Sequence, residues 1–430
     1  MDKLTVGLFN DSFPPTIDGV ANVVINYAKS IHNRLGYVVV ATPHYPDVAD
    51  QYPFEVIRYP SANVSKRIGY RAGYPFSSKI VEMLMEKNID IIHTHSPFSS
   101  AILARVVRHY TGAPVVITYH TKFDIDINRR IAFNPLRKVS LKFLLSNINA
   151  CDEVWAVSEG AGENLRKIGF KGDYLIMENG VDYQKGKSSQ EDMDKLRTKL
   201  ALNSHEITFL YVGRMMWYKG IKITLDALKI AKDQGENFKM IFVGDGLDSE
   251  AIKNYTKELN LENQCIFTGS IYDREDLKIY YSIADLFLFP STFDTNGIVI
   301  REASACSCPS ILIKDSAAAE GIENDFTGIL IKENKDSMAK ELIKACDDRD
   351  KLKRIGKNAT EHIYISWNDA VEKAYRRYEF ILDNYQKKEL KETDYPIFIR
   401  EFKLVKNRIL KGRRKINDHK DKIMQKWTRF

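Results

Sequence analysis

Short apolar, β-branched runs alternate with helical patterns along most of the chain. A first series of predicted strands covers residues 5–9, 38–41, 91–94, 115–118 and 154–157, with helical patterns between them, such as residues 22–33 and 78–87. A second series covers residues 208–212, 239–243, 264–268, 285–289 and 310–313. Because apolar strands that alternate with helices form parallel sheets covered on both faces, the pattern predicts an α/β fold.

The polar residues 182–189 separate the two series, so the 430-residue chain is predicted to form two doubly wound domains. Ligands bind at the carboxyl ends of strands in such sheets, and two facing domains would form a cleft. We predict an N-terminal domain over 1–190, a second domain over 191–366, a helix over 367–386 that crosses back to the first domain, and a tail over 387–430. Trp367, at the start of that helix, is predicted to be a packing residue.

Composition places the chain among globular proteins, since 44% of its residues are hydrophobic and 28% are charged. No run approaches 18 apolar residues, and the N-terminus leads directly into a strand without the apolar region of a signal peptide. The five cysteines show no disulfide or zinc spacing, and Cys306 and Cys308 are predicted to be core thiols. These features predict a cytoplasmic protein.

The most informative stretch is residues 289–312, where Asp294 and Glu302 flank the turn Thr295-Asn296-Gly297. An apolar strand over residues 286–289 precedes this turn, and a helical run over residues 298–305 follows it. A helix that starts there would offer free N–H groups and a positive dipole end to an anion. Two acids would repel a phosphate, so they are expected to hold hydroxyl groups on either side of it, as on a nucleotide-sugar. From spacing alone, a buried strand–helix turn with two surface acids is an equally good interpretation.

Other strand ends carry glycines and cations. Gly213-Arg214 follows one predicted strand and Lys219-Gly220 comes five residues later, but no complete Rossmann or P-loop fingerprint is present. Arg214 and Lys219 could neutralise the two negative charges of a nucleotide diphosphate. The alternative is a solvated loop with ordinary surface charges.

Many ordered motifs together resemble a known family. Between residues 3 and 385 they are FPPTIDGVANVV, IIHTHSP, ITYHTKFD, WAVSEGAGENL, IMENGVDYQ, VGRMMWYKG, FVGDGLD, FTGSI, IADLFLFPS, DTNGIVIREASA, SAAAEGIENDFTGIL and ISWNDAVEKAYRRYEFIL. In this order the chain resembles the GT-B glycosyltransferases of family 4, which are retaining and use nucleotide-sugars. The resemblance implies two Rossmann-like domains facing across a cleft, and it names no cofactor and no metal.

The resemblance also implies roles for individual residues. Those on the donor side are Gly19 near the diphosphate, Arg214 and Lys219 on the diphosphate, Asn296, Gly297 and Ile298 over the phosphate and sugar, and Glu302 on the ribose hydroxyls. His120 matches a histidine near the reacting sugar and scissile bond. Asp294 departs from the family pattern, which more often has glutamate, and this leaves the sugar open. The catalytic set is therefore predicted to be His120, Arg214, Lys219 and Asp294, with charge stabilisation on the leaving group as its main task.

Two further groups of polar residues have competing interpretations. Asp124 and Asp126 form a DxD that could indicate a metal–diphosphate site, but their place beside His120 favours an acceptor-side or incidental role. His93 and His95 lack the additional ligands that a zinc site needs, so a structural or cleft-lining role is preferred.

Two basic segments favour a membrane surface. Residues 128–145 combine five cations with apolar positions, and residues 390–430 place an apolar stripe among many cations. The tail 387–430 holds 15 Lys and Arg against 6 Asp and Glu, so it carries the basic character of the whole chain, whose net charge is +7. An ordinary packed helix is an alternative for residues 128–145. A coiled coil or partner helix and a merely solvated segment are alternatives for the tail, and nucleic acid is disfavoured because no recognition motif is present.

The motifs TYHTKFD and SAAAEGIENDFTGIL are similar to those of the bacterial subgroup that glycosylates diacylglycerol. The sequence therefore predicts transfer of a hexose from a UDP-sugar to a lipid acceptor at the cytoplasmic membrane face. The alternatives are an enzyme of polysaccharide or capsule assembly that acts on a polyprenyl-linked or soluble glycan, and, from another class, a nucleotide-sugar epimerase or a non-catalytic membrane-associated protein. The sequence does not specify the oligomeric state.

Overall fold

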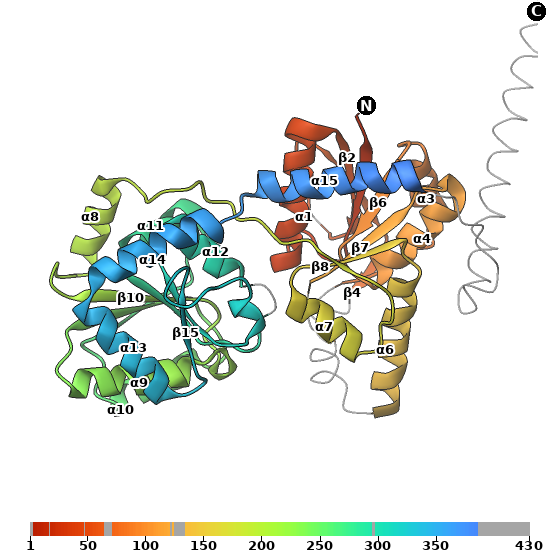
Figure 1. Cartoon of the computed structure of the whole chain (residues 1–430). Helices are drawn as coiled ribbons and strands as arrows, with labels where there is room; N and C mark the ends of the chain where they lie inside the picture. The colour runs from red at the N-terminus through yellow and green to blue at the C-terminus, as the bar shows by residue number, and fades with distance from the viewer. Residues whose placement is uncertain are drawn as a thin grey trace, which may run out of the picture. The chain divides into compact units, whose positions relative to one another are not determined.

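A computed structural model describes residues 3–16, 18–46, 48–63, 71–120, 123, 134–294 and 297–385 (Figure 1). The chain divides into two compact units. Unit 1 comprises Met1–Val157, Gly162–Met177 and Val371–Phe430, and unit 2 comprises Ser158–Ala161 and Glu178–Ala370. Unit 2 is thus inserted between two parts of unit 1.

Unit 1 is built around a parallel sheet whose described strands lie in the order β3-β2-β1-β6-β7-β8-β9. Its strands are β1 Thr5–Phe9, β2 Tyr37–Pro43, β3 Glu55–Tyr59, β6 Ile91–Thr94, β7 Val115–Tyr119, β8 Glu153–Ala156 and β9 Leu175–Ile176, with a separate hairpin of β4 Ser61–Asn63 and β5 Arg71–Gly73. Its helices are α1 Gly19–Ser30, which continues into a π-helical turn Ile31–Leu35, then α3 Ser78–Met85, α4 Ser99–Thr111, α6 Asn134–Asn149 and most of α7 Glu159–Lys167 and α15 Trp367–Asn384.

Unit 2 contains a second parallel sheet, in the order β12-β11-β10-β13-β14-β15 over the described residues. Its strands are β10 Ile207–Val212, β11 Phe238–Val243, β12 Cys265–Gly269, β13 Leu286–Phe289, β14 Ser310–Ile313 and β15 Ile329–Ile331. Its α-helices are α8 Gln190–Lys199, α9 Ile221–Asp233, α10 Ser249–Glu258, α11 Arg274–Ile283, α12 Ile298–Ala305, α13 Lys335–Asp347 and α14 Arg349–His362, with 3-10 turns at Trp217–Lys219 and Ala317–Ala319.

The predicted α/β class is confirmed, because both main sheets are parallel and alternate with helices. Along β10, Phe209 and Tyr211 lie in one buried cluster while Leu210 and Val212 lie in another, so both faces of the sheet are covered. This double burial explains why the strand reads as a continuous apolar run. Cys306 and Cys308 are fully buried in the second cluster, as predicted.

Four shorter or edge elements were not predicted from the apolar pattern: β3, the β4–β5 hairpin, β9 and β15. β9 has two residues and β15 has three, which is too short for a periodicity to register. β3 lies at one edge of its sheet and alternates buried with partly exposed residues instead of forming an apolar run.

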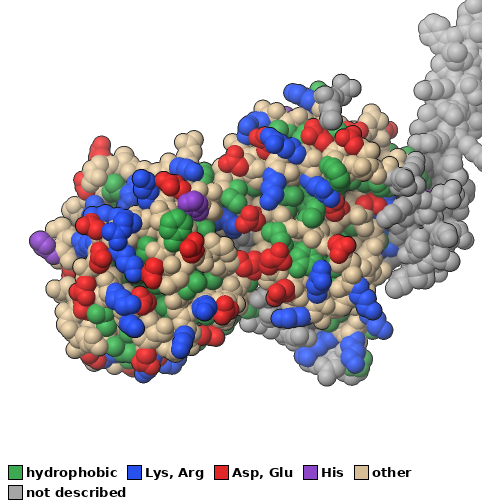
Figure 2. Space-filling view, in the orientation of Figure 1, with side chains coloured by type: hydrophobic (Ala, Val, Ile, Leu, Met, Phe, Trp, Pro, Cys, Tyr) green, Lys and Arg blue, Asp and Glu red, His purple; other side chains and the backbone are tan. Residues whose placement is uncertain are grey.

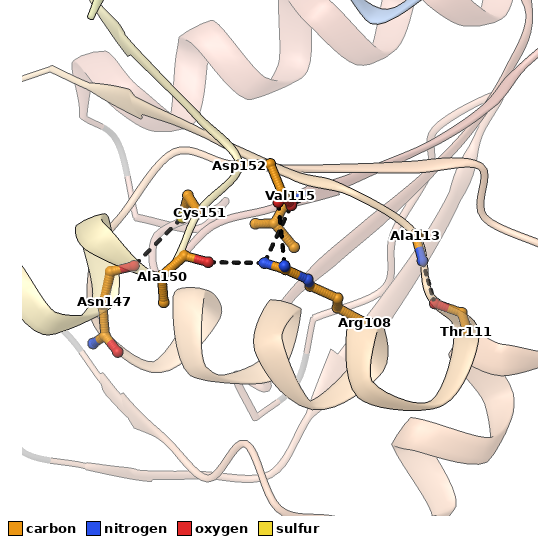
Figure 3. Close-up of polar contacts among 8 residues, drawn as sticks. All are labelled: Arg108, Thr111, Ala113, Val115, Asn147, Ala150, Cys151 and Asp152. Atoms are coloured by element: carbon orange, nitrogen blue, oxygen red, sulfur yellow. Dashed lines mark hydrogen bonds and ion pairs between the residues drawn. The ribbon is translucent and has the colours of Figure 1, made fainter. Parts of the chain in front are cut away.

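A buried ion pair fixes α4 against the amino end of β8 (Figure 3). Arg108 of α4 contacts Asp152 at 3.1 Å and donates to the Ala150 carbonyl at 2.8 Å, and Asp152 also accepts from the Val115 amide at 2.9 Å. Removing one partner of such a pair would leave an uncompensated buried charge and cost about 3–5 kcal/mol. This pair is a structural element of unit 1.

Helix α15 returns to unit 1, and three of its side chains make well-defined contacts there. Tyr375 accepts from the Leu4 amide at 2.9 Å, and Arg377 forms a two-pronged pair with Glu153 whose shortest distance is 2.6 Å. Tyr378 is fully buried and stacks on Trp155 with ring centroids 5.5 Å apart. The predicted return of the last helix to the first half of the chain is therefore observed, and Trp367 at its start is buried as predicted. No helix in the described residues is long and apolar enough to cross a membrane.

Candidate functional site

In unit 2 the polar residues predicted from the sequence gather where the strand order reverses. β10 lies between β11 and β13, so the loops that follow β10 and β13 leave the sheet in opposite directions. Lys219, from the first loop, contacts both carboxylate oxygens of Asp294, from the second, at 2.5 and 2.7 Å. The two residues, 75 positions apart in sequence, therefore meet at the crevice where such sheets bind ligands.

Lys219 is only 7% exposed. Burial lowers the pKa of its ammonium group and the nearby charge of Arg214 lowers it further, whereas Asp294 acts in the opposite direction. Ser291 donates to the same carboxylate of Asp294 at 2.6 Å, which fixes the orientation of that group. Arg214 is exposed at the same edge. The arrangement places two cations and one oriented carboxylate around one point.

Glycines let the backbone of these loops pack closely. A Cβ on Gly244, after β11, would lie 1.9 Å from the carbonyl oxygen of Gly213, after β10. Gly297 caps α12 in the left-handed region at φ 49°, and a Cβ there would lie 2.5 Å from the Ile300 side chain. Glycine is therefore needed by the fold itself at both places. α12 begins at Ile298, as the sequence predicted.

Glu302 lies on α12 and is 4% exposed. One carboxylate oxygen accepts from Arg274 at 2.5 Å and the other accepts from the hydroxyl of Tyr281 at 2.9 Å. Arg274 also lies over the ring of Tyr183 at 4.7 Å. Burial lowers the pKa of Arg274, but the negative charge of Glu302 and its hydrogen bond act in the opposite direction and raise that pKa above its ordinary value.

A second ion pair flanks the same helix. Arg301, one residue before Glu302, contacts Glu178, the first residue of the main segment of unit 2. Burial lowers the pKa of Arg301 and Glu178 opposes this. This pair joins α12 to the segment by which the chain enters unit 2.

In unit 1 the carboxyl edge holds a buried histidine cluster, formed by His93, His95 and His120. His93 belongs to β6, His95 directly follows it, and His120 directly follows β7. Nδ1 of His95 lies 3.0 Å from Nε2 of His120, and the His93 and His95 rings are 4.0 Å apart. The nitrogens of His93 contact the hydroxyl of Tyr378 at 2.6 Å and that of Thr118 at 2.7 Å.

Burial sets the protonation state of the histidine cluster. It lowers the pKa of His120 to about 3 and lowers the pKa values of His93 and His95 well below their ordinary range. The positive charge that a neighbouring imidazolium would carry lowers the values of His93 and His95 further. All three imidazoles are therefore neutral near pH 7.

Gly19 is the first residue of α1, whose N-cap Asp18 accepts from the Ala21 amide at 2.7 Å. A Cβ at Gly19 would meet no described atom within 4 Å. Packing against the described part of the protein therefore does not explain glycine at this position.

Several predicted site residues lie outside the described residues: Asn296, Asp124, Asp126 and the tail 387–430. The same holds for residues 128–133 of the predicted basic helix. Within the described part of the chain, no group of three or more His, Cys, Asp or Glu side chains is arranged to hold a metal ion.

The described part of that basic helix, α6, has two different halves. Leu144 and Ile148 are fully buried, whereas Leu136 is 51% exposed and Val139 is 61% exposed. Lys138 and Lys142 are exposed on the same stretch. In Figure 2, Lys and Arg side chains gather over the end where α6 begins. The beginning of α6 thus presents apolar and cationic side chains to solvent.

A cavity of about 420 Å³ opens in unit 1 at the amino ends of β8 and β9, away from the histidine cluster at the carboxyl edge. Three acidic residues line it, and two of them, Asp152 and Glu153, are paired with Arg108 and Arg377. Cys151 also lines it, and burial raises the pKa of that thiol to about 12, so the sulfur stays protonated.

Comparison with known proteins identifies the family. Residues 17–185 match the family described as Glycosyltransferase Family 4, and residues 192–362 match that described as Glycosyl transferases group 1. The chain belongs to the family 4 glycosyltransferases. The resemblance seen in the ordered motifs is thereby confirmed.

Individual relatives agree with this assignment. The chain is 27% identical over 312 residues to the alpha-monoglucosyldiacylglycerol synthase of Streptococcus pneumoniae, covering 72% of this chain and 70% of that protein. It is 24% identical over 371 residues to the alpha-monoglucosyldiacylglycerol synthase of Acholeplasma laidlawii, covering 83% and 92%. Anabaena HepE, solved in complex with UDP and glucose, superimposes with a TM-score of 0.69 at 21% identity, over 87% of this chain and 99% of that one. The GT-B fold of this glycosyltransferase is therefore confirmed.

Sequence reasoning on this family 4 glycosyltransferase missed the partners of its predicted residues. Arg274 and Tyr281 come from a different helix than Glu302, and Glu178 lies 123 positions before Arg301. No spacing rule could have paired them. A signal did exist for His95, because the motif HTH brings two histidines to the end of a strand that neighbours the His120 strand.

Proposed function

We propose that this glycosyltransferase moves a hexose from a UDP-sugar to a diacylglycerol-like lipid with retention of the anomeric configuration. The relatives named as alpha-monoglucosyldiacylglycerol synthases support the acceptor class. The observation that carries the donor site is the meeting of Lys219 and Asp294 at the strand-order reversal of unit 2. Burying the charge of Lys219 costs desolvation free energy unless an anion lies beside it, and in the described chain that anion is the carboxylate of Asp294.

The donor diphosphate is expected to bind Lys219, Arg214 and the start of α12. Lys219 has three donors, so it can bridge a phosphate oxygen and Asp294 together. Its positive charge would stabilise the charge that develops on the leaving diphosphate. Asp294, oriented by Ser291, would then face the sugar, and its short side chain would help to select which hydroxyl group fits.

Glu302 is proposed to accept hydrogen bonds from the ribose hydroxyls. Each carboxylate oxygen has a second lone pair, so the bonds from Arg274 and Tyr281 leave accepting capacity. These two donors hold the buried carboxylate in one rotamer, which prepares it for the nucleotide without a loss of side-chain entropy on binding.

On the acceptor side, His120 of unit 1 would contact the reacting sugar hydroxyls, with Asp124 and Asp126 as nearby acceptor candidates. Gly19 would allow close approach of its backbone to the donor diphosphate, which accounts for a glycine that the described packing does not require.

The exposed start of α6 and the basic tail 390–430 are proposed to hold the enzyme at an anionic membrane surface on the cytoplasmic side. Leu136 and Val139 would enter the interface while Lys138 and Lys142 meet lipid phosphates. A lipid acceptor would then be reached from the membrane in which it resides.

One assay tests the reaction. Purified protein is incubated with radiolabelled UDP-glucose and vesicles that contain diacylglycerol, and label is followed into the organic phase. Label on a glycan instead would indicate a polysaccharide-assembly enzyme, and epimerised UDP-sugar or no transfer would indicate the non-transferase alternatives. The anomeric configuration of the product, read by NMR, tests retention. A thermal-shift screen across UDP-, GDP- and ADP-sugars tests the base.

Vesicle partitioning tests the membrane proposal. Deleting residues 390–430 should weaken binding to anionic vesicles more at low salt than at high salt, because screening already weakens the electrostatic contribution at high salt. Replacing Leu136 and Val139 with serine should weaken binding at both salt concentrations. If the deletion variant bound vesicles as well as the full chain, the membrane role of the tail would be wrong, and a partner-helix role would be favoured.

A further inference from the structure

The contact between His95 and His120 has a chemical consequence. Both rings are buried, at 1% and 6% exposure, and the distance of 3.0 Å between Nδ1 of His95 and Nε2 of His120 is that of a hydrogen bond. Both imidazoles are neutral, so each carries a single N–H. One of the two rings must donate and the other must accept.

The far nitrogen of His95 indicates which ring donates. Nε2 of His95 is buried and has no hydrogen-bond partner among the described residues. If His120 donated, the proton of His95 would sit on this Nε2 as a buried, unpaired N–H, and orphaned buried N–H groups are rarer than under-satisfied acceptors. If His95 donates through Nδ1, its Nε2 is only an unused acceptor.

We infer that His95 is a positioning residue that donates from Nδ1–H to Nε2 of His120 and thereby fixes the proton of His120 on Nδ1. This inference rests on the proposed function in one respect, namely that His120 meets the reacting sugar. At Nδ1, His120 then carries an N–H rather than a bare nitrogen, and this group donates to an oxygen atom. Its task is to orient that oxygen, not to remove a proton from it.

The surroundings of His95 hold its ring in the donating orientation. The His93 ring packs against it at 4.0 Å, and His93 is itself fixed at both nitrogens by Tyr378 and Thr118. The ring of Tyr27 meets His95 edge-on at 5.3 Å. Rotation of the imidazole would require these neighbours to move, so Nδ1 of His95 stays directed at His120.

Histidine tautomers can be read directly. In protein labelled with 15N-histidine, a long-range 15N–1H spectrum separates protonated from bare ring nitrogens, and the His120→Asn variant identifies the His120 signals among the nine histidines. The expected result is a protonated Nδ1 and a bare Nε2. A protonated Nε2, or averaged shifts from exchanging tautomers, would overturn the inference.

Two nearly isosteric variants test the consequence for turnover. Asparagine at position 95 can still donate, whereas aspartate can only accept and would force the proton of His120 onto Nε2. We expect His95→Asp to lower kcat about 100-fold more than His95→Asn does, with donor KM changing much less than kcat in both. His109→Asp, at an exposed position of α4, is the matched control for the added charge.

Equal loss of kcat in the two variants, with both proteins folded by thermal melting, would show that His95 acts only through packing. If aspartate prevents folding, the tautomer measurement decides alone. The spectrum needs no substrate, so its outcome is separate from the proposed function. His120 protonated on Nδ1 in a protein without transferase activity would refute the function and leave the tautomer inference standing.

Discussion

The carboxyl edges of the two sheets handle buried polar groups in opposite ways. In unit 2 each buried charge has a counter-charge, as in the pairs of Lys219 with Asp294 and of Glu302 with Arg274. In unit 1 the histidine cluster uses neutral groups: His95 and His120 are hydrogen-bonded to each other, and His93 is bonded to two hydroxyl groups. No carboxylate is among the causes that shift the pKa values of these histidines, which are all lowered.

This contrast shows that the partners available at a buried site decide whether its titratable groups are charged. A buried ion is retained only where a partner offsets its desolvation, whereas an unpaired titratable group becomes neutral. The donor-side corner of unit 2 therefore keeps charges, which a phosphate requires, and the histidine cluster of unit 1 keeps neutral hydrogen-bonding groups, which suit hydroxyls. Four experiments test this contrast between the two units.

The largest effect is expected from Lys219→Met, which removes the buried charge of unit 2. Loss of stabilisation on the leaving diphosphate should lower kcat about 10²–10³-fold. Steady-state kinetics with the donor measures this. Lys222→Met, which removes an exposed lysine paired with Asp226, should leave kcat nearly unchanged. If Lys219→Met kept the full rate, the charge of Lys219 would not be needed for the reaction, and the role assigned to unit 2 would be wrong.

Glu302→Gln comes next, because it keeps the shape and removes the negative charge. We expect donor affinity or turnover to fall about 10–100-fold, since the charge-assisted bonds of the carboxylate are lost. Calorimetric titration with UDP and transfer assays measure the two effects. Glu250→Gln, on an exposed pair with Lys253, is the control. Full activity in Glu302→Gln would refute the donor-site assignment.

A smaller effect is expected from Asp294→Glu, which restores the residue more common in the family. The longer side chain cannot keep both oxygens on Lys219 and the bond from Ser291 in the same geometry. Donor selectivity, measured as kcat/KM for different UDP-hexoses, should change about tenfold at most. Identical selectivity would show that position 294 does not choose the sugar.

The last experiment concerns stability rather than activity, namely its dependence on pH in unit 1. In the unfolded chain His120 titrates near 6.5, whereas its pKa in the folded protein is about 3. Between these values the unfolded state binds more protons, so stability falls as pH falls below about 6.5. At pH 5 the loss from His120 alone is about 2 kcal/mol. Denaturant unfolding at pH 7 and pH 5 should show a smaller difference in His120→Asn than in the natural chain.

The sequence predicted the fold and the corner of the site well, and the physical reason is local. Buried parallel strands read as apolar runs, and α12 begins and ends where the pattern after Gly297 predicted. The residues that surround the corner could not be predicted, because Arg274 meets Glu302 only after α11 and α12 pack. Tyr378 meets His93 across 285 positions. Such contacts depend on tertiary packing, and no periodic pattern in the sequence indicates them.

The route of the chain through the two units bears on its synthesis. Apart from Ser158–Ala161, unit 2 is one continuous segment. Unit 1 instead combines residues that precede this segment with residues that follow it. A ribosome therefore releases every residue of unit 2 before it releases Tyr378 and the other residues of α15 that belong to unit 1. Until then the pocket for Tyr378 beside Trp155 and His93 has no occupant from α15. Unit 1 therefore cannot complete its packing until α15 is synthesised, and its apolar surface stays uncovered while unit 2 can already fold. Chaperones that shield nascent chains would find their main target here in the part that is made first.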